Sequence, residues 1–136
     1  MARIMGLDYG IKRCGIAATD TLQISVNPIG TVETKTLLDF FKEYLGKEDV
    51  EKLVIGLPTH KDGSFTYLKE NIDTFVAKIS KEYPDLSIDF EDETLTSVTA
   101  KEIILQSGVK KSKRRDKSLV DKISAVLILQ RYLGHI

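Results

Sequence analysis

The sequence has one cysteine, no excess of either charge and no long apolar run. Cys14 alone cannot form an internal disulfide, which fits a reducing compartment. No segment approaches the roughly twenty apolar residues of a membrane helix, and the N-terminus begins with a strand-like pattern instead of a signal segment. Twenty basic residues balance twenty acidic ones, so attraction to nucleic acid requires a local patch. We expect a cytoplasmic protein with no membrane partner.

The 136 residues match the usual size of one domain, and no repeat or linker divides them. Residues 2–33 have the pattern of three consecutive strands with short turns, which predicts an antiparallel meander. Pro28 lies in the third strand, so this strand is expected at a sheet edge or at a bulge. The sequence therefore predicts one domain, residues 1–136, that begins with a meander.

From residue 34 onward, helical and strand patterns alternate. Thr36 and Asp39 resemble a capping box at the start of the first helix, and Gly46 is expected to end it. Alternating strands and helices predict parallel strands joined by right-handed crossovers. The remaining expected elements are a strand at 53–57, a helix at 68–83, a strand at 86–90, a helix from about 96 to 108, and a helix at 118–134 whose apolar middle should be buried on all sides.

Asp8 is a carboxylate inside an apolar strand. It follows the apolar run at residues 4–7, where a lone charge costs several kcal/mol unless it is paired, hydrogen-bonded or bound to a metal. A turn follows, so Asp8 is expected near the end of its strand, with Lys12 and Arg13 at the hairpin. Its side chain either caps this turn or belongs to a functional site.

The strongest concentration of charge lies at residues 110–117, where six of the eight residues are basic. Such a segment is most often a solvated, mobile loop. It directly precedes the last predicted helix, so it is also placed to fold over a nucleic-acid backbone, with the 12–13 pair on the other side. The predicted nucleic-acid contacts are Lys12, Arg13, Lys110, Lys111, Lys113, Arg114 and Arg115.

Four motifs together resemble those of the YqgF (RuvX) family. They are Gly6-Leu7-Asp8-Tyr9-Gly10 with Lys12-Arg13, Val54-Ile55-Gly56-Leu57-Pro58 with Asp62-Gly63, Asp92-Glu93 before Leu95-Thr96-Ser97, and Val120-Asp121 with Ser124-Ala125. The resemblance spans essentially the whole chain. It implies an α/β fold of the ribonuclease H-like type: a mixed five-stranded sheet, made of an antiparallel three-strand meander plus two parallel strands, with helices on both faces.

The resemblance also implies a metal-dependent nuclease whose acidic ligands are Asp8, Glu93 and Asp121. Two Mg²⁺ or Mn²⁺ ions roughly 4 Å apart suit phosphodiester hydrolysis. Magnesium prefers oxygen ligands, which agrees with a chain whose only histidines are His60 and His135. The implied role is 5′-end processing of pre-16S ribosomal RNA, with structured RNA as partner. The alternative is a Holliday junction resolvase acting on branched DNA, and the choice between monomer and homodimer stays open.

From the residues alone, the assignment of two of these ligands, Glu93 and Asp121, stays open. Strand alternation places Asp92 and Glu93 on opposite faces, so a shift of one position would make Asp92 or Glu91 the ligand instead. An acidic residue at this point also suits the start of the following helix. Asp121 lies three residues after Ser118, which is the spacing of a capping box.

Further alternatives concern single positions and other classes of protein. Thr94 stands where the family usually has arginine, which changes one phosphate contact or ion pair. The candidates for base stacking are Tyr9, Phe65 and Tyr67, although core packing is the commoner role of such residues. One rival class of protein is the phosphate-binding half of an actin-like ATPase. Such an enzyme needs a second lobe, for which a chain of this length has no room. The other is a binding module that keeps the fold without catalysis.

Overall fold

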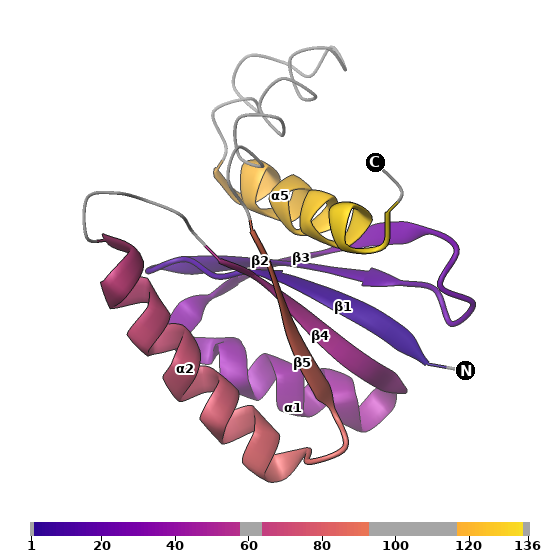
Figure 1. Cartoon of the computed structure of the whole chain (residues 1–136), viewed down its shortest axis with the longest axis horizontal. Helices are drawn as coiled ribbons and strands as arrows, with labels where there is room; N and C mark the ends of the chain where they lie inside the picture. Colours follow the sequence, from indigo (N-terminus) through magenta and orange to yellow (C-terminus); the bar gives the residue numbers. More distant parts are fainter. Residues whose placement is uncertain (1, 58–63, 93–116, 135–136) are drawn as a thin grey trace.

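The computed structural model describes residues 2–57, 64–92 and 117–134, with only the backbone described at 57, 64–67, 92 and 117–122. Five strands form one mixed sheet in the order β3-β2-β1-β4-β5. Figure 1 shows α5 on one face of this sheet and α1 and α2 on the other. The predicted α/β architecture, a meander plus two parallel strands with helices on both faces, is confirmed.

The meander consists of β1 (Arg3–Asp8), β2 (Arg13–Thr19) and β3 (Val26–Glu33), paired antiparallel in turn. Proline cannot donate a ladder hydrogen bond, so it is tolerated mainly at edges and bulges. β3 is an edge strand, and its register with β2 shifts between Ile16 and Ala17, where Pro28 pairs with Ala17. Both parts of the expectation for Pro28 are confirmed.

A short 3₁₀ turn, η1 (Thr34–Thr36), leads into α1 (Leu37–Lys47). The predicted capping box is wrong because the hydroxyl of Thr36 donates to the carbonyl of Glu33 (2.9 Å) and makes no cap bond. Gly46 lies within α1 and does not end it, since the helix continues to Lys47. Propensity signals therefore located this helix but not its ends.

The second half of the sheet is parallel. β4 (Val50–Leu57) pairs with β1, and β5 (Ser87–Asp92) pairs with β4, with α2 (Ser64–Glu82) as the crossover. The last helix, α5, spans Lys117–Tyr132. The predicted helix at 96–108 and the cationic residues up to 115 lie outside the described residues. Within the described ranges, no helix is long and apolar enough to cross a membrane.

Two apolar cores lie on the two faces of the sheet. The larger core packs α1 and α2 against one face and includes Met5, Leu7, Phe41, Ile55 and Phe75. The smaller core packs α5 against the other face and consists of Ile4, Ala17, Val54, Ala125, Ile128 and Leu129. Leu127 is also buried, whereas Val126 is only partly buried, so the middle of α5 is enclosed on most sides but not on all. Alternate residues of each central strand thus belong to different cores.

Candidate active site

Asp8 lies on the α5 face of the sheet, at the end of β1. Met5 and Leu7 belong to the core under α1 and α2, whereas Ile4 belongs to the core under α5. Strand alternation therefore places Gly6 and Asp8 on the α5 side. Asp8 is half-buried and is the last residue of the strand. The predicted position of this carboxylate at a strand end is confirmed.

Glycines stand on both sides of Asp8 in the sheet. Asp8 pairs with Gly15 of β2 and with Gly56 of β4. Paired residues point to the same face, and neighbouring strands lie about 4.8 Å apart, so any side chain at either position would stand directly beside the carboxylate. Within this row of the sheet, the two glycines thus place no Cβ atom next to Asp8.

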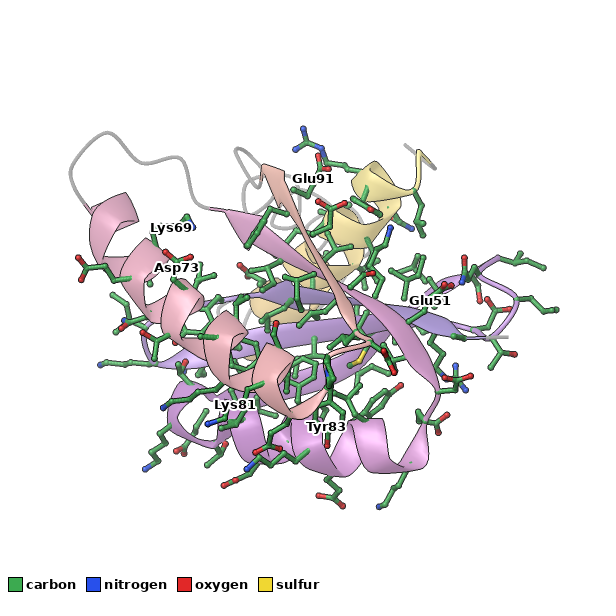
Figure 2. The ribbon with its side chains drawn as sticks, turned by 60° about the horizontal axis from the view of Figure 1, so that its bottom comes forward. Glu51, Lys69, Asp73, Lys81, Tyr83 and Glu91 are labelled. Carbon is green, nitrogen blue, oxygen red and sulfur yellow. The ribbon has the colours of Figure 1, made fainter. Side chains whose placement is uncertain are left out.

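The structure also identifies the face of β5 that Asp8 shares. Ile88 and Phe90 pack against the core under α1 and α2, so Asp89 and Glu91 lie on the α5 side. Glu91 pairs with Gly56, which pairs in turn with Asp8. Figure 2 shows Glu91 at one end of β5, far from Tyr83.

This alternation bears on the three neighbouring acids. It places Glu91 on the same face as Asp8, two strands away, at roughly 10 Å. Glu93 itself lies outside the described residues, and only the backbone of Asp92 is described.

Helix α5 passes over β1 in the opposite direction, as Figure 1 shows. A Cβ placed on Gly6 would lie 2.6 Å from Cγ of Leu129 and 3.0 Å from the carbonyl oxygen of Ala125, so this helix rests almost directly on β1. Asp121 lies about one turn before Ala125, toward the end of the sheet where β1 ends at Asp8. Only the backbone of Asp121 is described.

The boundary of α5 bears on the capping alternative for Asp121. The helix begins at Lys117, so Ser118 already lies inside it. In a capping box, the serine stands just outside the first turn. The observed boundary therefore disfavours a capping box at Ser118 and Asp121.

A polar clamp ties the other end of α5 to the sheet. The Lys52 ammonium donates to the hydroxyl of Tyr132 (2.8 Å), and this hydroxyl donates to Oδ2 of Asp89 (2.5 Å). The hydroxyl of Tyr132 raises the pKa of Lys52 and lowers the pKa of Asp89. These three residues join α5 to β4 and β5, and so fix the helix that carries Asp121.

The β1–β2 turn provides the described basic groups near Asp8. Arg13 alternates with the buried Cys14 and therefore lies on the Asp8 face, whereas Lys12 is exposed in the turn. With Ile11, Glu33 and Lys35 they line a hollow of about 420 Å³. The other predicted nucleic-acid contacts, Lys110, Lys111, Lys113, Arg114 and Arg115, lie outside the described residues.

Two further predictions concern aromatic and metal-ligating groups. Tyr9 is buried, with its ring centroid 6.4 Å from that of Phe75, so core packing is its main role. The side chains of Phe65 and Tyr67 are not among those described. Among the described residues, no group of three potential ligands could hold a metal ion, and Asp8 is the one predicted ligand whose side chain is included.

The mixed sheet, with a terminal helix lying over its first strand, defines a ribonuclease H-like fold. The RuvX family model, described as Holliday junction resolvase, matches residues 2–135. The chain therefore belongs to the RuvX family, and the resemblance seen in its motifs is confirmed. This membership favours nuclease chemistry over an actin-like ATPase.

Relatives of known name cover nearly the whole chain. A protein of Bacteroides fragilis, named "Putative pre-16S rRNA nuclease", is 46% identical over 133 residues, 98% of this chain and 96% of its own length. A protein of Porphyromonas gingivalis with the same name is 45% identical over 139 residues, 99% of this chain and 98% of its own length. The alignments therefore run from end to end.

Solved structures support the fold at much lower identity. T. thermophilus RuvC in complex with Holliday junction substrate matches with a TM-score of 0.59 and 14% identity, over 98% of this chain and 97% of that chain. Fowlpox virus resolvase, in complex with Holliday junction DNA, matches with a TM-score of 0.57 and 14% identity, over the same shares of each chain. At this identity, the similarity establishes the fold alone.

Proposed function

We propose that the protein is a metal-dependent nuclease that processes the 5′ end of pre-16S ribosomal RNA, and that residues 1–136 form one nuclease domain. The observation that carries the proposal is the half-buried carboxylate of Asp8 at the end of β1, between two glycines of the same row. The names of the end-to-end relatives support the substrate.

The topology supports Glu93 and Asp121 as the partners of Asp8. β1, β4 and β5 are parallel, so their last residues meet at one edge of the sheet. Glu93 follows β5 directly, and Asp121 belongs to the part of α5 that lies toward the same edge. The ends of β1 and β5 and the start of α5 at one edge of the sheet thus support this choice of partners.

This donor set suits hard divalent cations. Mg²⁺ and Mn²⁺ favour carboxylate oxygens and retain waters that a substrate phosphate can replace. Asp8, Glu93 and Asp121 would hold two such ions, and the glycines at 15 and 56 place no side chain of their own beside the first carboxylate. When bound, the ions supply an activated water and neutralise charge on the attacking and leaving oxygens.

The chain's own residues bind and orient the substrate. Arg13 lies on the Asp8 face and is placed to pair with a phosphate next to the scissile one, while the exposed Lys12 adds a second positive charge. The clamp of Tyr132 on Asp89 and Lys52 keeps α5, and with it Asp121, at a fixed height above the sheet. Such fixed geometry is what in-line phosphodiester cleavage requires.

The test compares wild type with Asp8→Asn on precursor RNA, single-stranded RNA and four-way DNA, with Mg²⁺ and with chelator. We expect wild type to cleave precursor RNA only with Mg²⁺, and Asp8→Asn to lose at least about a hundredfold in rate, as loss of a metal ligand implies. Asp73→Asn is the matched control, because Asp73 is an exposed acid of α2 paired with Lys69 (2.6 Å; Figure 2). Equal rates for wild type and Asp8→Asn would refute the site.

The second candidate is cleavage of four-way DNA. It is favoured by the description of the family and by fold neighbours that are complexes with Holliday junction substrates. Resolution requires two symmetric cuts and therefore a homodimer, whereas RNA trimming does not. Paired symmetric cleavage of four-way DNA by a dimer, with no cleavage of precursor RNA, would make this candidate the function.

A further inference from the structure

A second hollow lies on the opposite face of the sheet from Asp8, immediately beyond the end of β1. It measures about 300 Å³ and lies between α1 and α2, with Tyr9, the residue after Asp8, in its wall. Lys35 lines both this hollow and the hollow at the β1–β2 turn. The two hollows share this residue and both lie where β1 leads into the β1–β2 turn, and we call the two together the path.

The path is fixed in place by hydrogen bonds. The hydroxyl of Thr34 donates to the carbonyl of Gly10 (2.8 Å), and the amide of Thr34 donates to the carbonyl of Lys12 (2.9 Å). These bonds tie η1, which carries Lys35, to the β1–β2 turn. The backbone that carries Lys35 is thus held against the β1–β2 turn that carries Lys12.

The described charges along the path favour an anion. Four cations line the two hollows, namely Lys12, Arg13, Lys35 and Lys78, against the two carboxylates of Glu33 and Asp39. Lys35 lies 3.2 Å from Glu33, but both side chains are largely exposed, so water and salt weaken this pair. Cations that follow one another along a surface suit the phosphate backbone of a single strand.

The walls of the second hollow suit a nucleobase. Tyr9 and Phe75, both buried, contribute apolar lining to it. The hydroxyl of Thr74 donates to the carbonyl of Glu70 (3.0 Å), so its oxygen still accepts, and Asn71 offers both a donor and an acceptor. Apolar side chains with a few polar groups are the usual lining of a small-molecule site.

We propose that single-stranded RNA leaves the Asp8 end of the sheet across the β1–β2 turn, and that one of its nucleotides enters the hollow between α1 and α2. This inference rests on the proposed nuclease function and adds to it a site for substrate next to the cleaved bond. Lys35 and Lys78 contact phosphates there, and Asn71 contacts the base.

The experiment measures binding of a fluorescent single-stranded RNA in chelator, where no cleavage occurs. Lys35→Ala with Lys78→Ala should weaken binding roughly tenfold at 0.1 M salt and lower the salt slope by about 1.4, the value for two lost single-strand phosphate contacts. Lys47→Ala with Lys81→Ala is the matched control, because both are exposed lysines of α1 and α2 that do not line the hollow, and Figure 2 shows Lys81 toward the Tyr83 end of α2. The control should leave the slope unchanged.

A second measurement locates the base. RNA carrying 4-thiouridine should cross-link to the peptide containing Tyr9 or to α2, and Asn71→Ala should reduce this cross-link while thermal unfolding stays unchanged. Equal slopes for the two double variants, or cross-links confined to other segments, would overturn the inference. Loss of cleavage in Asp8→Asn, together with normal RNA binding by the Lys35→Ala, Lys78→Ala variant, would leave the nuclease proposal standing by itself. Binding that depends on Lys35 and Lys78, without any cleavage by wild type, would leave only the inference.

Discussion

Asp8 stands directly opposite Gly15 in the antiparallel pair of β1 and β2, so its partner in the pair places no side chain beside the carboxylate. We predict that Gly15→Ala lowers cleavage roughly 10- to 100-fold, because a methyl beside Asp8 displaces the reacting groups by a fraction of an ångström or more. Single-turnover rates on precursor RNA measure the effect. A variant with full activity would show that the clearance has no role.

Gly46 supplies the contrasting prediction. It lies inside α1, and an added Cβ would meet nothing within 4 Å. Gly46→Ala should therefore raise the free energy of unfolding by about 0.5–1 kcal/mol, since glycine costs a helix interior this much relative to alanine. Chemical denaturation checks it, and cleavage should be unaffected. A lower stability than wild type would contradict the prediction.

Gly6 should tolerate substitution poorly. A Cβ there would meet Cγ of Leu129 at 2.6 Å and the carbonyl oxygen of Ala125 at 3.0 Å. We predict that Gly6→Ala costs about 1–3 kcal/mol of stability, the usual cost of overpacking. In a double-mutant cycle with Leu129→Ala, the combined cost should be smaller than the sum, because the second change removes the clash. Strict additivity would show that α5 does not rest on Gly6.

The Tyr132 clamp predicts a pH dependence. The hydroxyl of Tyr132 lowers the pKa of Asp89 from its ordinary 3.8, so the stabilisation is present above this value and is lost as pH falls through the lower folded-state pKa. Tyr132→Phe should therefore be less stable than wild type at pH 7, and the difference should shrink below about pH 4. Unfolding curves at pH 3, 5 and 7 measure it. A constant difference would assign the effect to packing alone.

The contact between Tyr132 and Lys52 loses its stabilising effect at high pH, whereas the contact with Asp89 loses it at low pH. Tyr132 also raises the pKa of Lys52 from 10.5, and a raised pKa stabilises the fold below the unfolded value and loses this contribution as pH rises through the folded one. Neutral pH thus retains both contributions. A comparison of wild type and Tyr132→Phe between pH 7 and 10 should show little change.

Local patterns were enough to predict most of the fold. The apolar run at 53–57 and the three-four spacing from Leu68 predicted β4 and α2, whose observed bounds begin only three or four residues earlier. Helix ends were harder, as Thr36 and Gly46 show, because the turn of η1 and the packing of α1 decide them. Termini depend on contacts that a local pattern does not contain.

In the candidate site too, local sequence predicted some features, and others depended on contacts between distant segments. Asp8 stood out from sequence because a carboxylate interrupted an apolar strand. The roles of Gly15 and Gly56 could not be predicted from sequence, because these roles follow from the pairing of β1 with β2 and β4. The face of β5 was also undecidable until the packing of Phe90 was known. Long-range register is the information that one sequence lacks.

Magnesium should stabilise the folded protein through Asp8. A ligand bound only by the native state adds RT ln(1 + [L]/Kd), about 2.7 kcal/mol when its concentration is a hundred times Kd. We predict that Mg²⁺ or Mn²⁺ raises the melting temperature of wild type and Asp73→Asn, and that Asp8→Asn loses this increase because one anionic ligand is gone. Thermal unfolding with increasing metal, against a chelator baseline, measures it without substrate. An equal increase in all three proteins would place the ions elsewhere and remove the physical basis for a metal site at the end of β1.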